Sequence, residues 1–187
     1  MVSQLRAPFP HSVPERSART QDHPWLHAIA GTIQVFTSPH RTFFTNVMVQ
    51  AMQVAGQGHS VLITQFLKGG IRQGTDQPMQ FGQGLEWLRP DIERSLKTPD
   101  ATPAEREAIA QLWQHTEAAA MQGKYSLVVL DELSLAIQLE LIAEAAVLNF
   151  LQQRPSQVDV ILTGPDMPEA LLAIADQVTE FRRHFLP

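Results

Sequence analysis

Apolar and polar positions along the chain follow a pattern that predicts strands and helices in regular succession. The first strand and helix lie between Gly31 and Ala55. Residues 32–36 are mainly β-branched or aromatic, which favours a buried strand. Apolar residues then recur at the spacing of a helix with one buried face, at Phe44, Val47, Met48, Ala51, Met52 and Ala55. This segment therefore predicts a strand, a turn over residues 37–45 and a helix that begins near the end of the turn.

The same succession continues to the end of the chain. Further strands are predicted at 60–66, 126–130, 158–163 and 177–181, and a short strand at 85–88 inside the glycine-rich stretch 68–100. Helices are predicted from Thr102 to near Gly123, from about 134 to 153 and from about 168 to 175. The first of these opens with a threonine N-cap, a proline at the first helical position and the glutamate of a capping box. The stretch 68–100 has little periodicity, and loops of that length are usually functional or mobile.

Strands that alternate with helices predict an α/β fold, a doubly wound and mostly parallel sheet with helices on both faces. Right-handed crossovers bring the carboxyl ends of the strands to one edge, where such sheets bind ligands. We expect this edge to gather the turn 37–42 together with Gln65, Lys68, Asp131, Glu132, Thr163 and Pro165. The expectation follows from topology alone.

Composition narrows the class of protein. At 187 residues and 44% hydrophobic, the chain is long enough to bury one sizeable core, and we expect a single domain. A formal net charge of −5 argues against a nucleic-acid partner, because phosphates attract clustered Lys and Arg. The absence of cysteine excludes disulfides, thiolate metal sites and cysteine nucleophiles. No apolar run is long enough to span a bilayer, and the N-terminus lacks the apolar core of a signal peptide, so we expect a cytoplasmic protein.

Residues 1–24 differ in composition from the remainder, with Pro8, Pro10, Pro14 and Pro24 among Ser, Arg and Gln. Such a segment cannot build a core, and we predict a flexible N-terminal arm followed by a single α/β domain over residues 25–187. Two interpretations of the arm remain open. It is a poorly ordered tail, or it folds over a ligand or a partner subunit.

Other candidate constellations carry little weight. The only two histidines four residues apart, His23 and His27, flank Pro24 in a loose context, so we predict no zinc site. Ser-His-Asp catalysis has no nucleophile elbow to support it. We predict no metal centre from residue spacing.

Several short motifs occur in an order that resembles a known family. They are QFLKG at 65–69, VVLDEL at 128–133, RP at 154–155, LTG at 162–164 and ADQVTE at 175–180. Together they resemble the P-loop type of corrinoid adenosyltransferase, which transfers adenosyl from ATP to cobalt(I) corrinoids. The resemblance covers roughly residues 31–184. It implies a RecA-like P-loop NTPase fold, ATP and Mg²⁺ as cofactors, a corrinoid ligand and a homodimer.

The turn 37–45 departs from the family's phosphate-binding loop, which reads T-G-x-G-K-G-K-T-T. In register, this chain has Thr37, Ser38, Pro39, His40, Arg41, Thr42, Phe43, Phe44 and Thr45. Every glycine is replaced, so the backbone cannot easily aim successive N–H groups at a triphosphate, and Pro39 removes one N–H outright. Phe43 stands in place of the phosphate lysine. Phe44 replaces the Mg²⁺-binding hydroxyl and fits the apolar face of the helix instead.

Two polar residues of the turn, Arg41 and Thr45, keep open the hypothesis of an anion held at the helix N-terminus. Pro165 stands where the resemblance implies an arginine after LTG, so a second cationic contact is missing. Asp131 and Glu132 remain in place of the family's Mg²⁺-binding pair. The alternative interpretation is that this acidic pair is residual and caps the next helix or pairs with a nearby cation.

We predict that these losses remove several orders of magnitude from ATP-dependent catalysis, because each charged contact to a phosphate is worth a few kcal/mol. The sequence therefore favours a pseudoenzyme that has lost ATP binding and binds a corrinoid, another flat ligand or a protein partner. The alternative is an ordinary ATP-dependent corrinoid adenosyltransferase.

Overall fold

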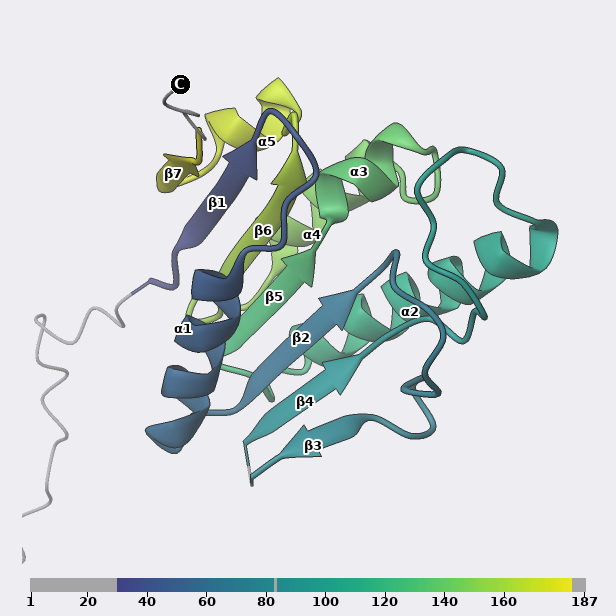
Figure 1. The fold of residues 1–187 in the computed structure, drawn as a ribbon. Coiled ribbons are helices and arrows are strands. Elements are labelled where there is room, and N and C mark those ends of the chain that lie inside the picture. The colour runs from purple at the N-terminus through teal and green to yellow at the C-terminus, as the bar shows by residue number, and fades with distance from the viewer. Residues whose placement is uncertain (1–29, 83, 183–187) are drawn as a thin grey trace, which may run out of the picture.

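The computed structural model describes residues 30–82 and 84–182, and these form one sheet with helices on both sides (Figure 1). The predicted arm 1–24 lies outside the described residues. The strands are β1 Ile33–Ser38, β2 Val61–Gln65, β3 Met79–Phe81, β4 Leu85–Leu88, β5 Leu127–Asp131, β6 Asp159–Pro165 and β7 Gln177–Glu180. The helices are α1 Thr45–Gly56, α2 Pro103–Met121, α3 Leu133–Gln138, α4 Glu144–Gln153 and α5 Glu169–Ala173.

The strand order across the seven-stranded sheet is β3-β4-β2-β5-β6-β1-β7. All neighbours pair in parallel except β3 and β4, which are antiparallel. Helices connect the parallel strands β1, β2, β5 and β6 along the chain, as a doubly wound sheet requires. This confirms the α/β fold predicted from the hydrophobic pattern.

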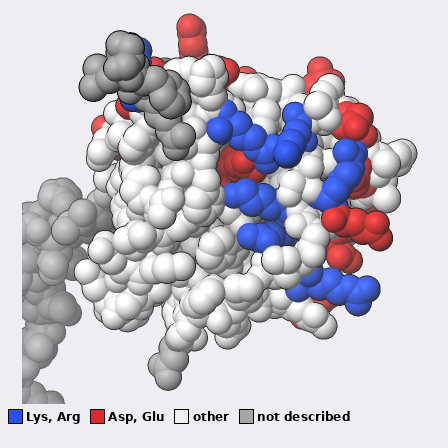
Figure 2. All heavy atoms as spheres, viewed as in Figure 1, with Lys and Arg blue, Asp and Glu red and all other residues white. Residues whose placement is uncertain are grey.

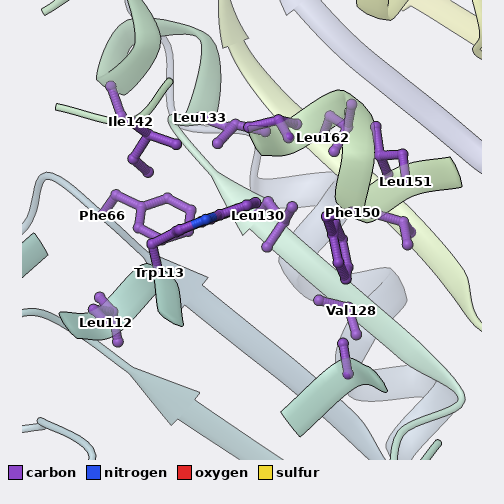
Figure 3. Close-up of a cluster of buried hydrophobic side chains, with 14 of the residues drawn as sticks. Phe66, Leu112, Trp113, Val128, Leu130, Leu133, Ile142, Phe150, Leu151 and Leu162 are labelled. Atoms are coloured by element: carbon purple, nitrogen blue, oxygen red, sulfur yellow. The ribbon is translucent and has the colours of Figure 1, made fainter. Parts of the chain in front are cut away.

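Two apolar layers cover the two faces of the sheet. On one face the buried side of α1, including Val47, Met48 and Ala51, packs on β2, β4 and β5. On the other face a larger cluster joins the sheet to the remaining helices. Its centre is Trp113 of α2, whose ring lies 6.0 Å from that of Phe66 and 5.8 Å from that of Phe150 in α4 (Figure 3). The sheet is therefore buried on both faces, which explains the near-continuous apolar runs of its central strands.

The single helix predicted over 134–153 is wrong. The structure has two helices, α3 and α4, with a break between them. Glu140 takes a left-handed conformation at φ 55°, and the N–H groups of Leu141 and Ile142 both donate to the carbonyl of Ala136. Leu139 and Ile142, on either side of the break, are both buried in the core.

Two smaller expectations also differ from the structure. Met52, predicted on the buried face of the first helix, is 43% exposed. Val49, also on this helix, is 46% exposed. Strand β3 was not predicted, because all three of its residues are exposed and none contributes to a buried face. The short strand predicted at 85–88 is confirmed as β4.

Helix α1 is unusual for a helix at the surface because it contains no charged residue. It has no side-chain cap at its N-terminus, no acidic residue in its first turn and no basic residue in its last turn. None of the helices in the described part of the chain is long and apolar enough to cross a bilayer.

Helix α2 is fixed at its N-terminus by the predicted capping box. The N–H of Glu105 donates to Thr102 Oγ1 at 3.3 Å, and the N–H of Thr102 donates to the Glu105 carboxylate at 2.7 Å. Arg94 adds two hydrogen bonds to the same carboxylate. The hydrogen bonds from Arg94, followed by those from Thr102, lower the pKa of Glu105 to about 2.

This shifted pKa makes a testable prediction about acid stability. Because the pKa of Glu105 is about 2 in the folded protein and near 4.5 otherwise, its charge stabilises the fold above pH 4.5, and this contribution is lost as the pH falls toward 2. Glu105→Gln keeps the capping acceptor but not the charge. The difference in unfolding free energy between the two proteins, measured by urea denaturation, should be largest above pH 5 and close near pH 2. A difference that stays constant with pH would contradict the assignment.

Candidate functional site

The carboxyl edge of the sheet brings together the polar residues expected there, and Asp131 is their centre. Asp131 ends β5, is 1% exposed and accepts three side-chain hydrogen bonds. Oδ1 accepts from Thr163 of β6 at 2.8 Å, and Oδ2 accepts from Gln65 of β2 at 2.6 Å and from Lys68 at 3.2 Å. Residues from three neighbouring strand ends therefore converge on a single buried carboxylate.

Glu132 follows directly and is held by Arg41 from the turn after β1. The guanidinium donates from Nε and a terminal nitrogen to the two carboxylate oxygens, at 2.5 and 2.7 Å. A second terminal nitrogen donates to the Leu96 carbonyl at 2.9 Å. Glu132 is 5% exposed, and the hydrogen bonds to it raise the pKa of Arg41. The pair is thus a bidentate ion pair, largely removed from water.

The backbone of Glu132 is also strained. At φ 58° and ψ 26° it lies in the left-handed region that non-glycine residues seldom adopt. Its N–H donates to Thr163 Oγ1 at 3.0 Å, which joins it to the residue that also binds Asp131. Such conformations persist only where the surroundings hold them, and they cluster at functional sites.

Lys68 lies between Asp131 and the turn. Its Nζ donates to Asp131 and stands 4.3 Å from the centre of the Phe43 ring. Phe43 is 49% exposed, and its ring makes a cation–π contact with the Lys68 ammonium. Phe44, by contrast, is buried with α1, as the apolar pattern predicted.

The turn 37–45 folds back on its own backbone. The hydroxyls of Ser38 and Thr42 both donate to the His40 carbonyl, whereas Pro39 and His40 are exposed. Thr45 is exposed at the start of α1, and its hydroxyl makes no hydrogen bond to a described residue. Arg41 and Thr45 are the two residues that could hold an anion at this helix end. Of these, Arg41 is already hydrogen-bonded to Glu132.

Pro165 ends β6 and is buried. Its carbonyl accepts from Ser134 Oγ at 2.5 Å, so this strand end is fastened to α3. The preceding Gly164 has φ +143°, and a Cβ there would lie 2.1 Å from Ser134 Oγ, which leaves room only for glycine. Pro165 therefore lies at the expected edge of the sheet, but it is buried.

Arg89, which follows β4, also reaches this network and was not among the predicted site residues. Its Nε donates to Gln65 Oε1 at 2.9 Å, and Gln65 in turn donates to Asp131. The signal for it was its position directly after the predicted strand 85–88. Figure 2 shows Lys and Arg side chains gathered around acidic ones over this edge, whereas the surface over α1 carries no charge.

The arrangement does not fit a divalent cation as it stands. All four carboxylate oxygens of the acidic pair accept hydrogen bonds from Thr163, Gln65, Lys68 or Arg41. Among residues 30–82 and 84–182, no three His, Asp or Glu side chains converge as a metal site. A Mg²⁺ ion that took over the present contacts of Glu132 would have to displace Arg41.

Comparison with known proteins places the chain in a family. The family described as ATP:corrinoid adenosyltransferase BtuR/CobO/CobP matches residues 30–185. The chain belongs to this family. The match spans every strand and helix of the sheet.

Three curated proteins are similar to this chain at about the same level. The chain is 28% identical to the corrinoid adenosyltransferase of Escherichia coli K12 over 91% of its own length and 83% of that protein. It is also 28% identical to the corrinoid adenosyltransferase CobA of Salmonella typhimurium LT2, over 81% of this chain and 76% of the relative. An uncharacterized protein of Nostoc is 30% identical over 65% of this chain and 34% of its own length.

The ion pair at the site predicts strong coupling between Arg41 and Glu132. Arg41→Met should lower the unfolding free energy by about 2 kcal/mol, because it leaves a buried carboxylate unpaired, and partial exposure of Arg41 keeps the loss below that of a fully buried pair. Glu132→Gln together with Arg41→Met should cost less than the two single changes combined, with a coupling of at least about 1 kcal/mol.

The exposed pair Arg182 and Glu180, 2.8 Å apart, is a matched control. The same cycle with Arg182→Gln and Glu180→Gln should give a coupling below about 0.5 kcal/mol. Both cycles are measured by chemical denaturation at neutral pH. Additive effects for Arg41 and Glu132 would show that their ion pair contributes nothing to stability.

Proposed function

We propose that this member of the family has lost ATP binding and acts as a non-catalytic module that binds a ligand or a protein. One observation carries the proposal: the two acidic residues in place of the Mg²⁺ pair are neutralised by cations of the same chain. Arg41 binds both oxygens of Glu132, and Lys68 binds Asp131. These cations take the role that Mg²⁺ would have beside a bound nucleotide.

The composition of the turn supports the same conclusion. A phosphate-binding loop relies on glycines that point backbone N–H groups at the anion and on a lysine that reaches the terminal phosphates. Residues 37–45 contain neither glycine nor lysine, and the hydroxyls of Ser38 and Thr42 are turned to the His40 carbonyl. Binding MgATP here would require breaking the Arg41–Glu132 pair with no glycine loop to offset the cost.

The second candidate is an ATP-dependent corrinoid adenosyltransferase, with a cobalt(I) corrinoid as substrate. The named relatives from Escherichia coli and Salmonella favour it, and so does the retention of Asp131 and Glu132 at the end of β5. In that case Arg41 and Lys68 release the carboxylates when nucleotide and metal arrive.

The binding module has two candidate occupants, a corrinoid at the carboxyl edge of the sheet or a protein partner. Family membership supports the first, and the uncharged outer surface of α1 supports the second. We also propose a homodimer, as the resemblance to the family implied. A nucleic-acid partner is disfavoured by the net charge of −5.

Titration calorimetry with MgATP, and absorbance titration with a corrinoid, separate the candidates. We expect no heat from MgATP at concentrations up to about 1 mM, because the loop and the acidic pair offer it no site. Corrinoid binding without ATP binding supports a carrier or sensor. ATP binding with a micromolar Kd would overturn the proposal and lead to an adenosyltransferase assay.

A loop replacement tests which feature excludes ATP. The variant exchanges residues 37–45 for the family pattern T-G-x-G-K-G-K-T-T, which includes Thr42→Gly and Phe43→Lys. A second variant keeps the natural loop and carries only the substitution Arg41→Ala. If the loop is the obstacle, MgATP binding should appear in the first variant and remain absent in the second. Binding that appears with Arg41→Ala alone would assign the exclusion to the ion pair.

A further inference from the structure

Beyond the end of β4, where Arg89 is joined to Asp131 through Gln65, the surface is hollowed into a cavity of about 340 Å³. Three segments form it: the loop 72–77 that follows β2, residues 89–91 after β4, and one turn of α2 that carries Ala108, Gln111 and Leu112. Its volume lies within the range of small-molecule sites. None of the residues of the turn 37–45 lines it.

Four charged side chains line the cavity, two of each sign. They are Arg72, Arg89, Asp76 and Asp91, and none of them forms an ion pair with any residue of the described part of the chain. By contrast, the nearby cations Arg41, Lys68 and Arg94 are all paired with carboxylates. The charged side chains of the cavity are therefore unpaired among the described residues, whereas these nearby cations are paired.

Arg89 is the least exposed of the four. It is half-buried, its Cζ lies 5.9 Å from the centre of the Trp87 ring, and its Nε is fixed by Gln65. Burial lowers the pKa of Arg89, yet a guanidinium remains protonated at neutral pH. Its two terminal nitrogens donate to no group among the described residues, so a cation that is partly removed from water still lacks an anionic partner.

The loop wall of the cavity is fixed to β4 by a hydrogen bond from the N–H of Arg89 to the Gln73 carbonyl at 2.8 Å. The side chain of Gln73 is 3% exposed, and neither Nε2 nor Oε1 has a partner among the described residues. Its neighbours Arg72 and Gly74 both line the cavity. Buried amides are rarely left unpaired. The Gln73 amide therefore gives this wall a hydrogen-bond donor and an acceptor that no described residue satisfies.

We propose that this cavity binds a small ligand whose anionic head, a carboxylate or a phosphate, lies between Arg72 and Arg89. Guanidinium groups match both head groups with paired hydrogen bonds. Asp76 and Asp91 then accept hydrogen bonds from hydroxyl or amine groups on the remainder of the ligand. The inference rests on the proposed function, because it names the ligand class of a binding module, but it uses neither the turn 37–45 nor the acidic pair as a contact.

Titration calorimetry with two sugar acids tests the site. Glucose 6-phosphate and gluconate carry a phosphate and a carboxylate beside several hydroxyls, and glucose is the neutral control. At least one acid should bind the full chain with a Kd below about 1 mM, and glucose should not bind. The acid that binds more tightly identifies the head group.

Variants locate the binding. Arg89→Gln and Arg72→Gln, the latter at an exposed residue, should each weaken binding about tenfold or more. Arg182→Gln removes a cation that follows β7, at the opposite edge of the sheet, and should leave binding unchanged. If Arg89→Gln does not fold, Arg72→Gln decides. No binding of either acid to the folded protein, or equal binding by Arg72→Gln and Arg182→Gln, would overturn the inference. MgATP is titrated separately. Binding of MgATP would contradict the proposed function, whereas absence of sugar-acid binding would contradict this site, so the two failures are distinguishable.

Discussion

The candidate site depends on one physical constraint: two adjacent carboxylates are buried at the end of a central strand. Asp131 and Glu132 are 1% and 5% exposed, and burying a carboxylate costs free energy unless it gains a counter-charge or several hydrogen-bond donors. A metal ion is one solution and side-chain cations are another. This chain uses Arg41 and Lys68, and the strands β1, β2, β5 and β6 are arranged so that their ends meet around these charges.

That solution explains several features at once. The Arg41 side chain spans from the turn after β1 to Glu132, and it also binds the Leu96 carbonyl, so it fastens the long loop before α2 to the site. Gln65 connects Asp131 to Arg89, which links the acidic pair to the neighbouring cavity. The left-handed backbone of Glu132 is held in place by Thr163 and Arg41 together. The network is electrostatically complete without a bound ion.

Most of the fold could be predicted from the sequence, because its central strands are short, apolar and separated by clear helix signals. The end of the helical pattern at Glu140 could not, since apolar residues continue on both sides of the break and a glutamate, not a glycine, takes the left-handed conformation. Strand β3 has only exposed residues and so leaves no hydrophobic pattern.

At the site, the sequence predicted which strand ends would meet but not how the charges would pair. Arg41 and Glu132 are 91 residues apart, and no local pattern connects them. The sequence supported the hypothesis that the acidic pair binds a nearby cation. Only the three-dimensional structure identified Arg41 as the cation that binds Glu132. Arg89 was missed because its importance comes from Gln65, a neutral residue whose side chain joins two charged ones.

The absence of charge from α1 has a consequence for how the protein opens. Without capping side chains, charges that complement the helix dipole or ion pairs along its surface, this helix has little stability of its own and depends on its contacts with β2, β4 and β5. In native-state hydrogen exchange, amides of α1 should therefore become unprotected with the turn before it, ahead of the central strands. The turn at which we propose that ATP binding was lost therefore belongs to the part of the fold that we expect to open first.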